Sequence, residues 1–322
     1  MIITQTPLRL SLFGGGTDFK EYYKKEQGAV LGFTINKYVY VLVNNRFESS
    51  VRASYSKTEN VSNTLELKHE LIKESLLDSG INNGIEVVTV ADVPGSGTGL
   101  GSSSSTLVGL LNSLAYFTKK PIDKESIAKK SCEIEINKIK SPIGKQDQYF
   151  AVHGGFCYFQ FNQDESVNIE KFSVSDKIIQ EIQDNMICFY TGIPRDASTI
   201  LTKQKEGVEK NRNILNKIRN LADDARDSLK NKDLTKFGEM LNKGWELKKR
   251  LSDNVSNDII DSYYKKAIKE GAIGGKINGA GGGGFITFYC EKKNQEKVKK
   301  TLNLKELNFK MEDEGTKLVF NS

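Results

Sequence analysis

The fold is restricted most strongly by a glycine- and serine-rich segment, PGSGTGLGSSSS, at residues 94–105. It follows the β-rich run Ile85–Val90 and leads into a helix predicted from about Ser103, with leucines at helical spacing. Such a loop exposes several backbone N–H groups at a helix N-terminus, where partial positive charge favours phosphate oxygens. Serine hydroxyls there can donate hydrogen bonds or act as hard oxygen ligands for Mg2+. The segment therefore predicts a phosphate-binding loop rather than a flexible linker.

Two common nucleotide-binding motifs do not account for the chain. The sequence has no GxxxxGK[ST], which argues against a P-loop NTPase. The segment KINGAGGGGF at residues 276–285 formally contains GxGxxG, but a helix is predicted before it and a strand after it. That order is the reverse of the dinucleotide-binding fingerprint. We expect this loop to pack its backbone against another glycine-rich loop or a ligand.

A further glycine-rich segment, PLRLSLFGGGTD, spans residues 7–18. A predicted strand runs into three consecutive glycines and then Thr17 and Asp18. Consecutive glycines allow a ligand to approach the backbone closely, but a flexible turn has the same composition. These residues alone do not decide between the two.

Candidate acid–base groups lie near residue 147. Pro142 and Gly144 are expected to break the preceding helix and to place Asp147 on a loop, where its carboxylate can accept a proton from a substrate hydroxyl. A solvated surface aspartate is the alternative. Upstream, Glu133 and Glu135 are two residues apart on a helix, so at most one should face a site. Phosphoryl transfer needs a phosphate loop, a metal held by hard oxygens and a carboxylate, and the chain has a candidate for each.

Composition excludes several other classes. The net charge of +6 is mild and the lysines are scattered, so a nucleic-acid-binding surface is not expected. The four cysteines form no CxxC pair, and only two histidines are present, which argues against a zinc site and against a disulfide framework. Neither a signal-peptide pattern nor a membrane-spanning apolar run is visible. These features predict a cytoplasmic protein in a reducing compartment, with no membrane partner.

Hydrophobic periodicity predicts a strand-rich first half and a more helical second half, with a domain change near residue 170. The two predicted domains are residues 1–170 and 171–322. The predicted elements of the first half include strands at Ile2–Thr6, Leu8–Phe13 and Tyr38–Asn44 and helices at Thr64–Ser79 and Asp123–Lys138, the last with Asp123 as N-cap.

The order and spacing of the three glycine-rich segments resemble the GHMP kinases, the superfamily of galactokinase, homoserine kinase and mevalonate kinase. The resemblance covers nearly the whole chain. It implies an α+β fold with an N-terminal ATP-binding domain like domain 2 of ribosomal protein S5 and a C-terminal ferredoxin-like domain. ATP, Mg2+ and a small-molecule substrate are expected in the cleft between them.

The resemblance also implies roles for individual residues. Asp147 would be the base or hydroxyl-orienting group, with Arg9 beside it, and Ser103 and Glu135 would hold Mg2+. The ATP phosphates would be bound by Pro94, Gly95, Gly97, Gly99, Leu100, Gly101, Ser102, Ser103 and Ser104. The substrate would be bound by Gly14, Gly15, Gly16, Thr17, Asp18, Gly144, Arg195, Gly279, Gly281 and Gly282.

Within the superfamily, the chain is most similar to D-glycero-D-manno-heptose 7-phosphate kinases, through PLRLSLFGGGTDF, GKQDQY and YTGIPRDAS. That activity phosphorylates the anomeric hydroxyl and yields the 1,7-bisphosphate for nucleotide-activated heptose synthesis. Gly15 and Gly16 replace a Glu-His pair of galactokinases, which argues against a galactose site and leaves room for a longer sugar phosphate. Arg195 is the first candidate partner for the 7-phosphate, and an exposed loop arginine is the alternative.

Three other interpretations stay open. The chain can be a GHMP kinase for another sugar, such as fucose or galacturonate. It can also be a kinase-like sugar sensor that binds ATP without catalysis, although Asp147, Ser103 and Glu135 are all present. RNA binding through an S5-like fold is the third, and the modest net charge argues against it. The residues do not indicate an oligomeric state.

Overall fold

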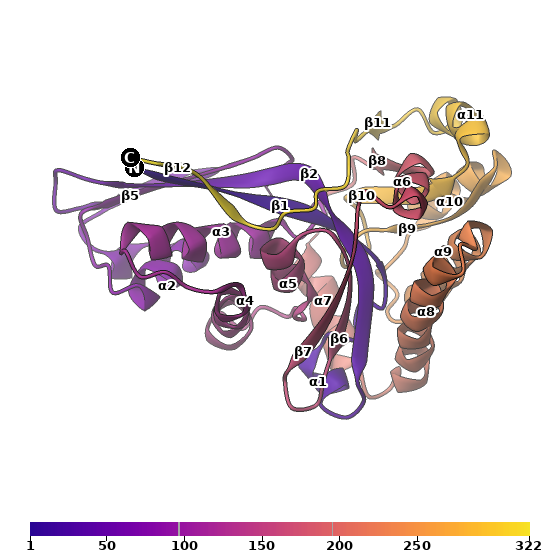
Figure 1. Cartoon of the computed structure of the whole chain (residues 1–322), viewed down its shortest axis with the longest axis horizontal. Coiled ribbons are helices and arrows are strands. Elements are labelled where there is room, and N and C mark those ends of the chain that lie inside the picture. Colours follow the sequence, from indigo (N-terminus) through magenta and orange to yellow (C-terminus); the bar gives the residue numbers. More distant parts are fainter. Residues whose placement is uncertain (96, 195) are drawn as a thin grey trace.

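The structure is a computed structural model that describes residues 1–95, 97–194 and 196–322, and two β-sheets organise this part of the chain (Figure 1). The larger sheet has the strand order β12-β1-β2-β5-β3-β4, and β6 and β7 extend it from the first half of β2. Its strands are β1 Ile2–Phe13, β2 Gly28–Asn45, β3 Val51–Ser54, β4 Thr58–Val61, β5 Ile85–Ala91, β6 Phe156–Phe161, β7 Val167–Phe172 and β12 Lys317–Asn321.

The first two strands are longer than predicted. β1 continues through Pro7, where two strands were expected, and its register with β2 shifts between Pro7 and Leu8. A shift of this kind is where a strand tolerates proline. In β2 only Tyr38–Asn44 was predicted, because the first eight residues of the strand are all buried and show no alternation. Because both strands are long, their buried residues extend into the centre of the molecule.

Helices cover one face of this sheet (Figure 1). The fit of α3, Ser102–Phe117, depends on Gly109, where an added Cβ would lie 2.9 Å from both Thr6 Oγ1 and Val41 Cγ2. This close approach places the middle of α3 directly against β1 and β2. The other helical elements of this half are α1 Lys20–Tyr23, a 3₁₀ turn at Thr64–Glu66, α2 Glu70–Asp78, α4 Lys124–Cys132, a π-helix at Glu133–Lys138 and α5 Gln146–His153.

Two predicted helices differ from the structure in where they begin or in the type of their last turns. The helix expected at Thr64–Ser79 begins only at Glu70, because His69 Nδ1 accepts the Ile72 N–H at 3.4 Å and so caps a new helix there. The helix expected at Asp123–Lys138 has its predicted N-cap, since Asp123 Oδ1 accepts the Ser126 N–H at 2.9 Å. Its last part is a π-helix rather than an α-helix, and such wider turns often occur at functional sites.

The second sheet has the order β11-β8-β10-β9 and is antiparallel. Its strands are β8 Met186–Tyr190, β9 Ala272–Ile277, β10 Phe285–Cys290 and β11 Lys305–Glu306. The helices of this half are α6 Lys177–Asp184, α7 Ala197–Glu206, α8 Arg212–Lys230, α9 Leu234–Lys249, α10 Asp258–Lys269 and α11 Lys292–Leu302. The sheets are antiparallel except for the parallel pair β3–β5, and the helices are segregated from the strands, which confirms the α+β class.

The third glycine-rich segment needs one correction. It was expected to follow a helix directly, but β9 lies between α10 and the loop, so residues 278–284 join two antiparallel strands. Gly271, which ends α10 with φ +104°, forms the switch into β9. Since no helix follows the loop, the rejection of a dinucleotide-binding motif stands.

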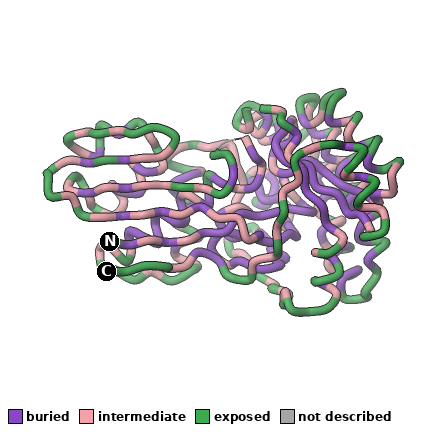
Figure 2. Tube along the Cα trace, turned by 90° about the horizontal axis from the view of Figure 1, so that it is seen from above, coloured by how far each residue is buried: buried purple, intermediate pink, exposed green. Residues whose placement is uncertain are grey.

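One continuous hydrophobic core joins the two sheets. The rings of Phe13 and Phe237 meet edge to face at 5.1 Å, and both belong to a buried cluster that reaches from β2 to β10. In Figure 2 the end of the molecule near the two termini is mostly partly buried or exposed, and the long buried stretches lie toward the opposite end. This shared core holds the two halves of any cleft between them in one relative position.

The chain returns to its starting sheet at its end. β12 pairs antiparallel with β1, and the N-terminal amine donates to the Ser322 carbonyl at 3.3 Å (Figure 1). The division at residue 170 therefore does not separate all strands of the larger sheet from the second half, and as a domain boundary it stays a prediction. Across residues 1–95, 97–194 and 196–322, every helix is too short or too polar to cross a bilayer.

Candidate active site

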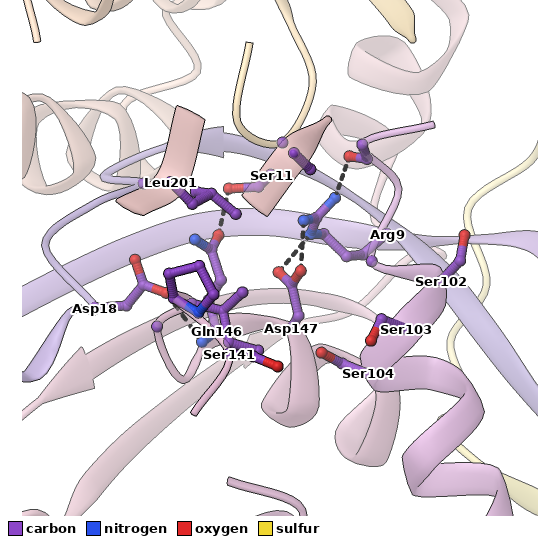
Figure 3. Close-up of a pocket in the computed structure, with 18 of the residues that line it drawn as sticks. Arg9, Ser11, Asp18, Ser102, Ser103, Ser104, Ser141, Gln146, Asp147 and Leu201 are labelled. Atoms are coloured by element: carbon purple, nitrogen blue, oxygen red, sulfur yellow. Dashed lines mark hydrogen bonds and ion pairs between the residues drawn. The ribbon is translucent and has the colours of Figure 1, made fainter. Parts of the chain in front are cut away.

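A cavity of about 340 Å³ opens between the two sheets, where the three glycine-rich segments meet (Figure 3). Its floor comes from β1 and the starts of α3 and α5, and its other side comes from α7, α9 and β9. The polar and charged side chains that line it are Arg9, Ser11, Asp18, Thr98, Ser102, Ser103, Ser104, Glu135, Ser141, Gln146, Asp147, Ser198, Gln204, Lys248 and Lys276.

The predicted phosphate loop forms one end of the cavity. Gly97, Gly99 and Gly101 have φ of 72°, 77° and 79°, a left-handed conformation that only glycine adopts without strain. Gly101 is the N-cap of α3, so the N–H groups of the first helical turn face the cavity end. The predicted packing against the third glycine-rich segment is confirmed, because the Phe285 N–H donates to the Thr98 carbonyl at 3.1 Å.

A buried carboxylate lies behind the start of α3. The Glu135 oxygens accept hydrogen bonds from Ser103 Oγ at 2.5 Å and from Ser104 Oγ and Gln148 Nε2 at 2.8 Å each. Glu133 is exposed, so only one of the two glutamates faces the site, as predicted. Burial raises the pKa of Glu135, and the nearby charge of Asp147 adds to the rise.

This cluster fits a hard divalent cation. Carboxylate and hydroxyl oxygens are the donors that Mg2+ prefers, and Glu135 and Ser103 supply one of each. Next to them, Gln148 Oε1 is buried and has no hydrogen-bond partner among the described residues. Among those residues, no three or more His, Cys, Asp or Glu side chains lie close enough together to hold a metal ion. A metal here would thus depend on hydroxyl, substrate or water oxygens as well.

An ion pair joins β1 to α5 at the centre of the cavity (Figure 3). Arg9 Nε donates to Asp147 Oδ1 at 2.8 Å, and its Nη2 donates to Asp147 Oδ2 at 2.7 Å. Arg9 Nη1 also donates to the Gly99 carbonyl at 2.6 Å, which links the pair to the phosphate loop. The bidentate geometry fixes the carboxylate plane. Asp147 lies in the first turn of α5 rather than on a loop, because the helix restarts directly after Gly144.

The opposite end of the cavity is formed around Asp18. Its Oδ1 accepts the Gly16 N–H at 2.9 Å and its Oδ2 accepts the Gln146 N–H at 3.2 Å. A Cβ at Gly144 would lie 2.1 Å from Asp18 Oδ2, so the glycine is needed for this approach. Burial, followed by the charge of Asp147, raises the pKa of Asp18.

Two lysines of the cavity were not singled out from the sequence. Lys276 on β9 is 6% exposed, and its Nζ donates to the carbonyls of Ser11 at 2.7 Å and Leu12 at 2.9 Å. Burial, followed by the charge of Arg9, lowers the pKa of Lys276 to about 7. Lys248 on α9 donates to the Gly279 carbonyl. The sequence signal that could have identified Lys276 is its position just before a glycine-rich loop. No such signal marks Lys248, which continues an apolar stripe of its helix.

Most of the predicted site residues meet in this cavity. Those that line it are Arg9, Gly15, Gly16, Asp18, Gly95, Gly97, Gly99, Gly101, Ser102, Ser103, Ser104, Glu135, Gly144, Asp147 and Gly279. Those that lie outside its lining are Gly14, Thr17, Pro94, Leu100, Gly281 and Gly282. Thr17 is fully buried; its hydroxyl donates to the Gly14 carbonyl at 2.8 Å and accepts the Ala29 N–H at 3.0 Å. Arg195, the predicted phosphate partner, lies outside the described residues.

Two protein families match the chain. Residues 64–155 match the GHMP kinases N terminal domain, and residues 225–306 match the GHMP kinases C terminal domain. The first match contains the phosphate loop, Glu135 and Asp147, and the second contains the third glycine-rich loop and Lys276.

Individual relatives are similar over most of the chain. The D-glycero-alpha-D-manno-heptose 7-phosphate kinase of Campylobacter jejuni is 35% identical over 311 residues, which cover 90% of this chain and 89% of the relative. A solved structure of a D-glycero-D-manno-heptose 1-phosphate kinase from Bacteroides thetaiotaomicron is 26% identical, with a TM-score of 0.83 and complete coverage of both chains. The L-fucokinase/L-fucose-1-P guanylyltransferase of Bacteroides fragilis is 30% identical over 224 residues, 67% of this chain and 23% of that protein.

Proposed function

Since this chain belongs to the GHMP kinases, which are ATP-dependent phosphotransferases, we propose that it phosphorylates the anomeric hydroxyl of D-glycero-D-manno-heptose 7-phosphate. The products would be the 1,7-bisphosphate and ADP. The bisphosphate would then enter nucleotide-activated heptose synthesis. The relative from Campylobacter jejuni, which bears this activity in its name, aligns over nearly all of both chains and motivates the choice of substrate.

The proposed reaction rests on one structural observation, the Arg9–Asp147 ion pair. Its carboxylate lies at the centre of the cavity, between the phosphate loop and Asp18, where an attacking hydroxyl must be placed (Figure 3). Asp147 orients that hydroxyl and accepts its proton as the oxygen bonds to the γ-phosphorus and the bond to the β-phosphate oxygen breaks. Arg9 holds the carboxylate in one plane and places positive charge next to the phosphoryl group in transfer.

The nucleotide would bind at the start of α3. The N–H groups of the loop and of the first helical turn bind the triphosphate oxygens, with the helix dipole adding attraction. Ser103 and Glu135 would hold Mg2+, which when bound neutralises phosphate charge and fixes the phosphate geometry. The Ser103–Glu135 hydrogen bond keeps both ligands in place before the metal arrives.

The acceptor would lie between Asp147 and the loop at residues 14–16. Asp18 accepts hydrogen bonds from sugar hydroxyls there, while its own position is fixed by two backbone N–H groups. Gly15 and Gly16 add no side chains to this end of the cavity, which leaves space for a seven-carbon sugar and its phosphate. Lys248, which lines the cavity from the second half of the chain, adds positive charge that favours an anionic acceptor.

A second candidate differs in the acceptor position. The structural relative from Bacteroides thetaiotaomicron is named a heptose 1-phosphate kinase, so phosphorylation at the other end of the sugar is an alternative product. The test is a panel of heptose 7-phosphate, heptose 1-phosphate, fucose and galacturonate with ATP and Mg2+, read out by ADP release and by 31P NMR of the product. We expect turnover of the 7-phosphate and a new phosphorus signal coupled to the anomeric proton. Efficient turnover of an unphosphorylated sugar, with none of the 7-phosphate, would refute the proposal.

A further inference from the structure

Among the described residues, two polar side-chain contacts connect β1 to the start of α5. The first is the Arg9–Asp147 ion pair. The second is a hydrogen bond in which Ser11 Oγ donates to Gln146 Oε1 at 2.6 Å. Arg9 and Ser11 are two residues apart on a strand and so share a face, and both contacts line the cavity. Figure 3 shows the Gln146 side chain between Asp147 and Asp18.

The second contact leaves one polar group open to the cavity. Because the Ser11 hydroxyl donates to Oε1, the carboxamide NH2 of Gln146 faces away from Ser11, and its Nε2 has no hydrogen-bond partner among the described residues. An ideal Cβ at Gly15 would lie 3.7 Å from Nε2 and 3.8 Å from Ser11 Oγ. A glycine there keeps the pair uncovered, whereas a longer side chain would lie over it.

Further hydrogen bonds fix the positions of both Ser11 and Gln146. The Gln146 N–H donates to Asp18 Oδ2 at 3.2 Å, and the Ser11 carbonyl accepts from Lys276 Nζ at 2.7 Å. Ser11 itself is 4% exposed. The orientation of the carboxamide is thus set before a ligand binds, which is the condition under which a hydrogen bond adds selectivity at little entropic cost.

We propose that Gln146 is a specificity-determining residue, which donates a hydrogen bond to the hydroxyl on the carbon next to the phosphorylated one, and that Ser11 is its positioning residue. The inference rests on the proposed function, in which the neighbouring Asp147 orients the reacting hydroxyl. The substrate class that it selects is a vicinal diol, as in a sugar, over an alcohol without a neighbouring hydroxyl.

The donor and acceptor chemistry suits a hydroxyl at this place. A sugar hydroxyl donates one hydrogen bond and accepts others, while the carboxylate of Asp18 offers only acceptors and the Gln146 NH2 offers only donors. A hydroxyl between them can satisfy both. An analogue that lacks it leaves the NH2 unpaired in the closed complex, so the site discriminates against that analogue.

The test compares two enzymes with two substrates. Wild type and Gln146→Met, which keeps the side-chain length and removes the donor, are each assayed with heptose 7-phosphate and with its 2-deoxy analogue. We expect Gln146→Met to lower kcat/KM about tenfold for the parent sugar and less than about twofold for the analogue, as for the loss of one hydrogen bond. An equal loss for both substrates would mean a purely structural role and would overturn the inference.

Two further variants serve as controls. Gln148→Met alters the next glutamine of the same helix, whose carboxamide donates to Glu135, and should lower turnover of both sugars alike. Ser11→Ala releases the carboxamide and should cost a few-fold in kcat/KM for the parent sugar alone. A Ser11→Ala loss that is equal for both sugars contradicts the positioning role.

Failure of the proposed function can be told apart from failure of this inference. If wild type does not phosphorylate the heptose phosphate, the proposed substrate is wrong, and the same comparison is made with the sugar that is turned over and its deoxy analogue. If Gln146→Met does not fold, as judged by circular dichroism, Gln146→Glu removes the same donor with the same shape. In every case, only a loss confined to the hydroxylated substrate supports the inference.

Discussion

The nucleotide end of the cleft, residues 97–104, is made largely of main chain, whereas the acceptor end around Asp18 is made of side chains from separate elements. At the first end, three glycines in left-handed conformation and the start of one helix present N–H groups. At the second end, Ser11, Gln146 and Lys276 come from β1, α5 and β9.

This difference separates phosphate binding, which is general, from recognition of one acceptor, which is specific. Backbone N–H groups bind any phosphate in the same way, so the loop can serve many acceptors. Side chains such as Asp18 and Gln146 differ in donors and acceptors, so in the proposed function their identity selects the acceptor. Asp147 lies at the boundary, and Arg9 links it to the Gly99 carbonyl of the nucleotide end.

The largest effect is expected for Asp147→Asn, which separates binding from chemistry at that boundary. The amide keeps the shape but cannot accept the proton, so kcat should fall about 10³-fold while nucleotide affinity stays within about threefold. Steady-state kinetics and isothermal titration calorimetry with an ATP analogue measure the two quantities. Asp253→Asn, at an exposed aspartate, is the matched control. A fully active Asp147→Asn enzyme would remove Asp147 from the reaction.

A smaller effect is expected for Gly101→Ala, which tests whether the nucleotide end depends on the main chain. The φ of +79° and a Cβ only 3.3 Å from Arg9 Cγ should cost about 1–2 kcal/mol of stability and raise the nucleotide Kd about tenfold. The control is Gly244→Ala within α9, where the nearest atom is Leu221 Cδ1 at 3.8 Å. It should stabilise by about 0.5–1 kcal/mol without changing Kd. Equal Kd values for both variants would contradict the comparison.

The last prediction concerns pH and the acceptor end. The pKa of Lys276 is about 7 in the folded protein and returns to its ordinary, higher value on unfolding. Between about pH 7 and 10 the unfolded chain therefore binds the proton that the folded chain has released, so this group makes folding more favourable as pH rises. Wild type should gain stability relative to Lys276→Met over that range, measured by urea unfolding at about pH 6.5, 8 and 9.5. A constant difference would show that Lys276 keeps its proton throughout.

Local patterns were sufficient for much of the fold and for the nucleotide end. The Asp123 cap, the start of α3 within one residue and the packing of the third glycine-rich loop on the second were all predicted correctly. Each depends on residues close together in the sequence or on glycines whose backbone conformation restricts the alternatives.

Other features had no local signal. The passage of β1 through Pro7, the buried first half of β2 and the π-helix that carries Glu135 arise from tertiary packing. The same holds for β12, which is separated from β1 by almost the whole chain and yet pairs with it. Strand length and pairing depend on which partner becomes available, and that partner lies far away along the chain.

Asp147 and Gln146 show which features of the site the sequence indicates and which depend on the tertiary structure. Residue types and glycine spacing were enough to indicate a candidate phosphate loop, a candidate metal-binding carboxylate and a candidate base, because those roles require particular chemical groups, and the roles themselves stay predictions. The contacts of Arg9 with Asp147, Ser11 with Gln146 and Lys276 with the end of β1 span 138, 135 and 265 residues of sequence. Which side chains meet across such distances follows from the packing of two sheets on one core, since contacts between remote residues leave no periodic pattern in the chain.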